Sequence, residues 1–313
     1  MNRLNNFEKS IVKTLCYSDI FEYPLTMGEI YKYYLGRRAS EEKIYSNILT
    51  LIKKGLINRT GDYVYLAGRT KLSKLRKRRL KISTAKWMYA ARAISLLSKI
   101  PTVQLIGVSG SLSMDNAKKS DDIDMFFITK AGTLWITRFF VNLTLVANGV
   151  KRGKNGFSAA NKICPNMFVS EDNMTMDRNL FCAHEIVQMK VLVNKNNTYE
   201  KFIASNGWVK EYMPNSFEVR RQRREGKRKG SVSKVMGLLD RAFYLAQYIY
   251  MKKSITTEKI TPNLAKFHPR DMTNFIQILH AQRYQFYMKS FGKNGDFQPQ
   301  ISDFSRSRVT PGY

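Results

Sequence analysis

The N-terminal part of the chain carries apolar side chains with the period of an α-helix. Apolar residues recur every three or four positions in the segments 7–21 and 40–54, and the capping-box pattern Thr26-Met-Gly-Glu29 opens another helix between them. Residues 58–69 then alternate in side-chain character beside a Thr-Gly-Asp turn, a pattern typical of a β-hairpin. Residues 1–68 are therefore expected to form three helices followed by a hairpin.

This order of elements looks like a winged helix-turn-helix. The third predicted helix has a polar face opposite its apolar stripe, made of Lys43, Asn47, Thr50 and Lys54. These side chains suit contact with a groove of DNA or RNA. Two other interpretations stay open, because a solvated helix presents the same kind of face and because small winged helices also bind proteins.

Residues 69–100 are expected to form one long basic helix that links this unit to the rest of the chain. Its first half lacks acidic residues and carries Arg69, Lys71, Lys74, Arg76, Lys77, Arg78, Arg79 and Lys81. Its second half is amphipathic, with Trp87, Ile94 and Leu97 at helical spacing. So dense a run of one charge favours contact with phosphates, and a solvated linker is the alternative.

The rest of the chain predicts a small mixed β-sheet domain followed by helices, so the expected fold class is α+β. Within residues 101–195, strands are expected at 101–111, 121–129 and 163–170, and helices at 133–150 and 178–192. Residues 196–290 look all-helical, and the polar residues 291–313 are expected to form a flexible tail. The helix at 133–150 is interrupted by Arg138, Asn142 and Asn148, which favours a buried core helix over a membrane span.

The charge balance points to a polyanionic partner. The chain has 313 residues with 53 Lys and Arg against 24 Asp and Glu, a formal net charge of +29. Such an excess favours nucleic acid or another polyanion as a partner. Three cysteines without a CxxC pair exclude a disulfide scaffold and a zinc ribbon, and the start of the chain lacks the apolar core of a signal peptide. A cytoplasmic protein without a transmembrane segment is expected.

The stretch 105–129 carries the candidate chemistry. An apolar strand runs into Gly110-Ser111, and Asp122 and Asp124 follow inside a second apolar strand. Residues two apart on a strand share a face, so both carboxylates project together. Paired carboxylates in apolar surroundings are costly unless a cation lies between them, and hard oxygen ligands suit Mg²⁺. A glycine and a serine at a helix start supply free N–H groups and a hydroxyl that suit a phosphate.

The pattern Gly110-Ser111 … Asp122-Ile123-Asp124 resembles the hallmark of the DNA polymerase β-type nucleotidyltransferase superfamily. The resemblance covers roughly residues 101–175 and implies a small mixed-sheet nucleotidyltransferase domain. It also implies a two-ion Mg²⁺ site at Asp122 and Asp124, with Gly110 and Ser111 holding the phosphates of an NTP. The reaction implied is transfer of a nucleoside monophosphate to an acceptor hydroxyl, with release of pyrophosphate.

The chain departs from this family at the third carboxylate, which the next core strand usually supplies. The best-matching position in the strand 163–170 holds Asn166, an amide that cannot act as a base, and Glu171 or Asp172 just beyond the strand are the candidate substitutes. The adjacent pair His184-Glu185 is a weaker candidate for acid–base work, because neighbouring helix residues point about 100° apart and one of them is expected to face the core.

Two functions from different classes therefore follow from the sequence. The first is a Mg²⁺-dependent nucleotidyltransferase, and the second is a non-catalytic nucleic-acid-binding regulator with a degenerate nucleotidyltransferase domain. Whether metal and NTP bind at Asp122 and Asp124 separates the two. The sequence leaves open the acceptor, the base of the NTP and the oligomeric state.

Overall fold

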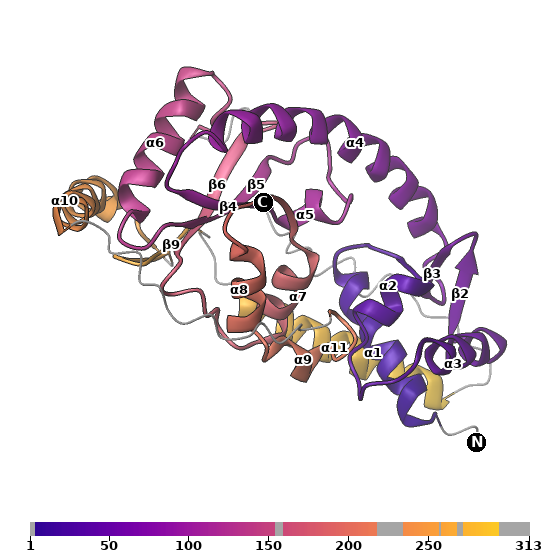
Figure 1. Ribbon diagram of the computed structural model, residues 1–313. Helices are drawn as coiled ribbons and strands as arrows, with labels where there is room; N and C mark the ends of the chain where they lie inside the picture. Colours follow the sequence, from indigo (N-terminus) through magenta and orange to yellow (C-terminus); the bar gives the residue numbers. More distant parts are fainter. Residues whose placement is uncertain (1–3, 154–158, 218–233, 257, 268–271, 294–313) are drawn as a thin grey trace.

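The computed structural model describes residues 4–153, 159–217, 234–256, 258–267 and 272–293. Over these ranges the protein is α+β with a mixed central sheet, as expected, and helices lie on both sides of that sheet (Figure 1). Of the tail predicted at 291–313, residues 291–293 belong to the last helix and the others lie outside the described residues.

The N-terminal unit has the predicted three helices and hairpin. Its helices are α1 (Asn6–Ile20), α2 (Met27–Lys32) and α3 (Glu41–Lys53), and its strands are β1 (Leu25–Thr26), β2 (Ile57–Thr60) and β3 (Tyr63–Leu66). The strands form an antiparallel sheet in the order β1-β3-β2. The capping box predicted at Thr26 and Glu29 is present, with each side chain bonded to the backbone of the other residue.

The polar face expected on α3 is only partly free. Asn47 is buried and its Oδ1 accepts a hydrogen bond from Asn5 Nδ2 at 2.9 Å, and Lys54 Nζ lies 2.6 Å from Glu8 Oε1. Both side chains therefore hold α3 against the start of α1. Lys43 and Thr50 are exposed, so only these two remain available to a partner.

The predicted linking helix is α4 (Lys71–Leu97), which arches from the N-terminal unit to the central sheet (Figure 1). The expectation that its basic run as a whole contacts phosphate is wrong for three arginines, which form ion pairs inside the protein. These pairs are Arg69 with Asp19, Arg76 with Glu29 and Arg79 with Glu22. The repulsion within the run is thus relieved by acids of the N-terminal unit, which are distant in sequence and close in space.

The central sheet has the strand order β7-β4-β5-β6-β9-β8. Its strands are β4 (Val103–Val108), β5 (Ile123–Thr129), β6 (Ile163–Ser170), β7 (Lys190–Asn194), β8 (Lys259–Thr261) and β9 (Leu264–Lys266). Strands β5 and β6 are parallel, and the other neighbouring pairs are antiparallel.

Three strands of this sheet correct the sequence-based expectations. The helix expected over 178–192 ends at Gln188, and β7 follows it and pairs with β4. The region 196–290 is not all-helical, because the hairpin β8–β9 extends the sheet beside β6. All three strands are short: the edge strands β7 and β8 have five and three residues, and β9, between β6 and β8, has three. Pairing with a neighbouring strand, more than the local sequence, makes them strands.

The helices that follow α4 cover the two faces of the central sheet. They are α5 (Gly110–Ser113), α6 (Leu134–Ala147), α7 (Leu180–Gln188), α8 (Thr198–Ser205), α9 (Val209–Tyr212), α10 (Lys234–Met251) and α11 (Met272–Lys293), with a short 3₁₀ turn at Lys252–Ser254. Met125 and Phe127 of β5 share a core with α4 and α6, whereas Phe126 and Ile128 share one with α7 and α8. Alternation along β5 therefore decides which helices lie over each of its side chains.

No helix within the described ranges is long and apolar enough to cross a membrane. The segment expected as a buried core helix is α6, and it is buried on one side only. Trp135, Val141 and Leu145 are buried, while Phe139, Leu143 and other apolar side chains on the outer side are exposed.

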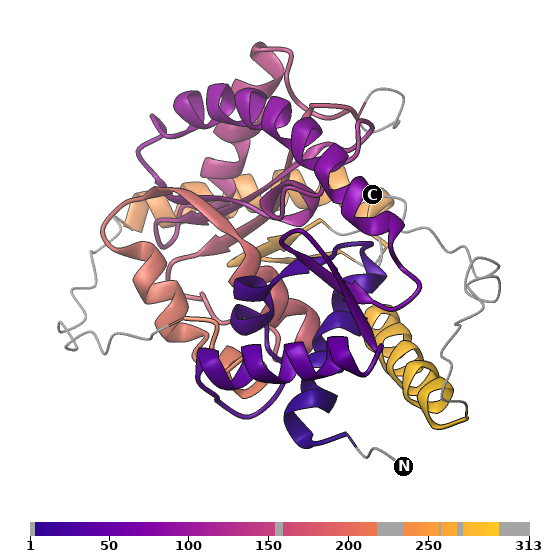
Figure 2. The same cartoon turned by 90° about the vertical axis from the view of Figure 1, so that its right-hand side faces the viewer.

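Three aromatic rings join the N-terminal unit to the rest of the protein. His184 of α7 stacks on Tyr17 of α1 with 3.7 Å between ring centroids, and His280 of α11 meets the same ring edge-on at 5.4 Å. Figure 2 shows α11 beside the N-terminal helices. Burial, together with the nearby His280, lowers the pKa of His184 to about 3, and burial also lowers the pKa of His280. The predicted His184-Glu185 pair is thus divided, with His184 in the core.

We expect His184 to make the stability of the protein depend on pH. The unfolded chain takes up a proton on this residue below about pH 6.5, whereas the folded protein takes it up only near pH 3. Stability from this group is therefore fully present above about pH 6.5 and falls by up to about 1.4 kcal/mol per pH unit as the pH drops toward 3. His184→Phe, which keeps a ring against Tyr17, should remove that part of the slope.

The measurement is urea unfolding of the parent protein and His184→Phe at pH 7 and pH 5. The parent should lose about 2 kcal/mol more than the variant between these two values. Carboxylates titrate alike in both proteins, so they cancel in the comparison. Equal losses in the two proteins would show that His184 does not carry the effect.

Candidate metal centre and the pocket beside it

The two predicted carboxylates lie together at the start of β5. Asp122 is buried and Asp124 is half-buried, and with Phe126 they alternate onto the face of the sheet that α7 covers. The strand around them is apolar and fully buried from Met125 to Thr129. The pattern of β5 therefore places two negative charges at the edge of a hydrophobic core.

Gly110 allows the backbone after β4 to lie directly against Asp124. The Ser109 N–H donates to the Asp124 carbonyl oxygen at 3.1 Å, which continues the pairing of β4 with β5. Gly110 has φ of +64°, and a Cβ at this position would be only 2.7 Å from Asp124 Oδ2. The space that a side chain would take at residue 110 is therefore occupied by the carboxylate.

Ser111 supports the loop that leads into β5. Its hydroxyl donates to Asp121 Oδ2 at 2.8 Å, and the Lys118 N–H donates to the same oxygen at 2.9 Å. The fully buried Lys86 of α4 donates to the Asp121 carbonyl oxygen at 2.6 Å. The Ser111 hydroxyl thus has an internal partner, and phosphate binding by Ser111 stays a prediction.

The residue that pairs with Asp124 on β6 is Cys164. Asn166 lies on the predicted neighbouring strand but two positions beyond Cys164, at the bulge that follows the Met125–Pro165 pair, so it is not the residue paired with Asp124. One ligand atom from each of Asp122, Asp124 and Cys164 lies within 4.8 Å of the other two. The third group of the cluster is therefore a thiol.

Glu171 and Asp172 lie at the far end of the sheet. The Glu171 N–H donates to the Thr129 carbonyl oxygen at 2.9 Å, and Thr129 is five positions along β5 from Asp124. At about 3.3 Å per residue, this separation is about 16 Å. Neither acid is in place to serve as the third carboxylate.

Arg152 supplies positive charge at the cluster. Its Nη1 lies 2.6 Å from Asp122 Oδ2 and 3.8 Å from Cys164 Sγ, and a third of its side chain is exposed. This ion pair compensates one of the two carboxylates. The other carboxylate, on Asp124, has no basic partner of its own in the described part of the chain.

The electrostatics of the cluster favour a bound cation. Burial, followed by the charges of Asp122 and Glu185, raises the pKa of Asp124 well above its usual range, and Arg152 only partly opposes them. Burial, followed by the charges of Asp124 and Asp122, raises the pKa of Cys164. A divalent cation would reverse both effects by stabilising the deprotonated forms. The three donor atoms, which lie within 4.8 Å of one another, fit such an ion.

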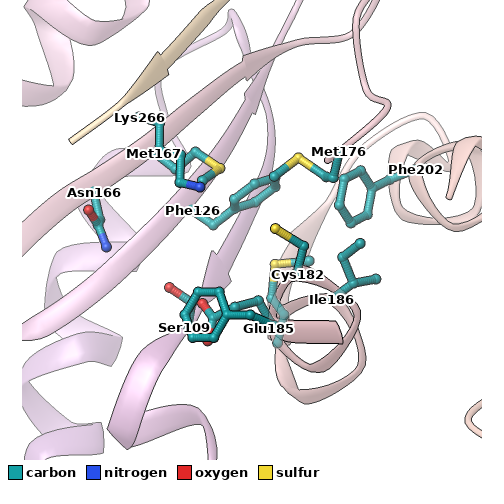
Figure 3. A pocket seen from close by; sticks show the side chains of 12 residues that line it. Ser109, Phe126, Asn166, Met167, Met176, Cys182, Glu185, Ile186, Phe202 and Lys266 are labelled. Carbon is teal, nitrogen blue, oxygen red and sulfur yellow. The ribbon is translucent and has the colours of Figure 1, made fainter. Parts of the chain in front are cut away.

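Glu185 is the functional candidate that sequence reasoning weighted too low. It lies on α7 and lines a pocket with Ser109, Asn166 and Lys266, among apolar side chains that include Phe126 (Figure 3). Burial raises the pKa of Glu185 to about 7, although the nearby Lys266 lowers it. The sequence does contain a basis for this prediction. Adjacent helix residues point about 100° apart, so if His184 faces the core, Glu185 must point in another direction, toward the sheet.

We expect Gly110→Ala to disturb the position of Asp124. A left-handed backbone costs an alanine about 1–2 kcal/mol, and the new methyl group also overlaps the carboxylate. The matched control is Gly149→Ala, since Gly149 has φ of +63° and nothing within 4 Å of an added Cβ. Both variants should lose stability in urea unfolding. A divalent ion such as Mn²⁺ that binds the cluster should raise the melting temperature of the parent and of Gly149→Ala, and Gly110→Ala should lose this rise. An unchanged Mn²⁺ effect in Gly110→Ala would separate Gly110 from the metal centre.

Comparison with protein-family models, curated proteins and solved structures gives no match for this chain. Its function must therefore be inferred from the residues around Asp122 and Asp124. These residues combine a potential metal centre, a glycine turn against one carboxylate and a pocket with a third acid.

Proposed function

We propose that this protein is a nucleotidyltransferase that transfers a nucleoside monophosphate from an NTP to an acceptor hydroxyl. The observation that carries the proposal is the close approach of Asp124 to the backbone of Gly110, with Asp122 directly before the same strand. This contact brings together the two halves of the Gly-Ser and Asp-x-Asp motif. We further propose that the central sheet belongs to a nucleotidyltransferase domain and that residues 1–68 form a winged helix-turn-helix.

In this proposal Asp122 and Asp124 hold the divalent cation, which is Mg²⁺ in the superfamily that the motif resembles. A bound divalent cation supplies charge neutralisation for the phosphates and for the leaving pyrophosphate. The N–H groups at Gly110 and Ser111 would bind the phosphates next to the carboxylates. Phe126 and the other apolar side chains of the pocket exclude water from the reacting groups.

Glu185 serves as the general base in place of a strand carboxylate. The acceptor hydroxyl oxygen bonds to the α-phosphorus, the bond to the β-phosphate breaks, and the hydroxyl proton passes to the Glu185 carboxylate. Glu185 lines the pocket with Ser109, the residue before Gly110, and with Phe126, two positions after Asp124 on β5. Its own pKa of about 7 suits proton transfer near neutral pH.

The first test measures the binding of ATP, GTP, CTP and UTP, each with Mg²⁺, by the change in the melting temperature of the protein. An NTP at 100 times its Kd stabilises the folded protein by about 2.7 kcal/mol, which raises Tm by several degrees. Asp122→Asn combined with Asp124→Asn should abolish this rise. An equal rise in that double variant would contradict nucleotide binding at the two carboxylates.

Glu185→Gln separates binding from chemistry in the same assay. This variant should keep the rise in Tm and lose about 10²–10⁴-fold in nucleotide transfer, because the amide cannot accept the proton. Transfer is followed as labelled nucleotide joined to RNA, DNA or the protein itself. Glu171→Gln and Asp172→Asn are the matched controls, since both acids lie far from the site, and they should transfer like the parent. Full activity in Glu185→Gln would exclude Glu185 as the base.

A second candidate function, nucleic-acid binding, is favoured by the outer face of α4. Its cations Lys71, Lys74, Lys77, Arg78 and Lys81 are exposed, and no acid of the described ranges forms an ion pair with them. The spacing of three or four residues places them along one side of the helix. Such a basic stripe suits the phosphates of a nucleic acid, either as the acceptor of the enzyme or as the partner of a non-catalytic regulator.

Changing these five residues to glutamine should weaken binding of RNA and DNA nearly uniformly across sequences. The dependence of log K on log salt should flatten by about 0.9 for each phosphate that the variant no longer neutralises. The control changes five other exposed cations to glutamine and so removes the same total charge. It should keep the parent's dependence of log K on log salt. These residues are Lys99, Lys130, Arg241, Lys252 and Lys253. Equal losses in both variants would indicate that net charge, and not the α4 face, attracts the nucleic acid.

A further inference from the structure

The metal centre differs in its donor atoms from an all-oxygen site. Cys164 lies directly across from Asp124 in the parallel pair β5–β6, so the sheet itself holds a sulfur beside the carboxylates. Asp122, Asp124 and Cys164 bring two oxygens and one sulfur within 4.8 Å of one another. In a tetrahedral site with metal–ligand distances of about 2.0–2.3 Å, ligand atoms are about 3.5 Å apart, so small side-chain rotations complete the set.

Thiolate and carboxylate ligands select different metal ions. Mg²⁺ takes oxygen ligands in octahedral geometry and keeps several waters, whereas Zn²⁺ and Co²⁺ accept thiolate sulfur readily. Three protein ligands with a remaining open position are the common pattern of catalytic zinc sites. We propose that Asp122, Asp124 and Cys164 bind one thiophilic divalent cation of the Zn²⁺ class in the absence of nucleotide, in preference to Mg²⁺.

Two further features of the cluster accommodate this ion. Residue 110 is a glycine, so no side chain from this position crowds the Asp124 carboxylate. A Cβ at Gly110 would lie 2.7 Å from Asp124 Oδ2. Without a metal ion, the Arg152 guanidinium supplies the positive charge at the cluster, because it contacts both Asp122 and Cys164. Its side chain is partly exposed and can turn into solvent when the ion binds. Binding then replaces a single positive charge by a double one between the same acidic groups.

The inference rests on the proposed function in using the same carboxylates, but it concerns ion binding and not transfer. The protein, freed of metal by chelation, is titrated with Co²⁺ and with Cd²⁺ while the thiolate-to-metal charge-transfer absorption is recorded. The parent should develop this band with one ion per chain, and millimolar Mg²⁺ should not remove it. Cys164→Ser should lose the band and bind Co²⁺ roughly 100-fold more weakly.

Two variants control for nonspecific effects. Cys182→Ser alters a buried thiol outside the cluster and should keep the band. Cys164→Asp creates an all-oxygen set and should shift the preference from Co²⁺ to Mg²⁺, which keeps the proposal testable if Cys164→Ser folds poorly. A missing band in the parent, a band that persists in Cys164→Ser, or displacement of Co²⁺ by an equal concentration of Mg²⁺ would overturn it. A band without nucleotide transfer would uphold this site and contradict the proposed function, and transfer without a band would do the reverse.

Discussion

The site depends on two carboxylates held at the buried start of an apolar strand. Asp122 and Asp124 cannot both stay charged there unless positive charge compensates them. Several surrounding residues contribute to the arrangement of the two carboxylates. Arg152 pairs with Asp122, and Gly110 clears a space beside Asp124. Lys86 and Ser111 fix the loop that enters the strand. A cation between the acidic groups would compensate the remaining negative charge, and both the proposed transfer chemistry and the proposed choice of metal follow from this requirement.

Helix α7 connects the N-terminal unit to this site. On one side its His184 stacks against Tyr17, and on the other side Glu185 lines the pocket that also contains Ser109 and Phe126. Helix α4 makes a second connection, because Arg79 pairs with Glu22 while Lys86 holds the loop before Asp122. A partner bound by the N-terminal unit or by the exposed face of α4 therefore contacts elements that also position the site.

Much of the local structure was predictable because it depends on neighbours in sequence. The capping box at Thr26, the long helix after residue 70 and the shared face of Asp122 and Asp124 all follow from spacings of two to four residues. The predictions that failed concern partners distant in sequence. Arg76 and Arg79 were expected to face phosphate and instead pair with acids about fifty residues earlier, and β8 and β9 became strands by pairing beside β6.

The sequence by itself determined that two carboxylates share one strand face next to a Gly-Ser turn, since alternation along a strand is a local property. Only the tertiary structure decided which groups complete the cluster. The register between β5 and β6 is set across an intervening helix, so Cys164, and not Asn166, pairs with Asp124. The packing of His184 against Tyr17 likewise decided that Glu185 faces the pocket lined by Ser109 and Asn166. Pairing register and helix rotation depend on contacts between distant segments, and no local pattern encodes them.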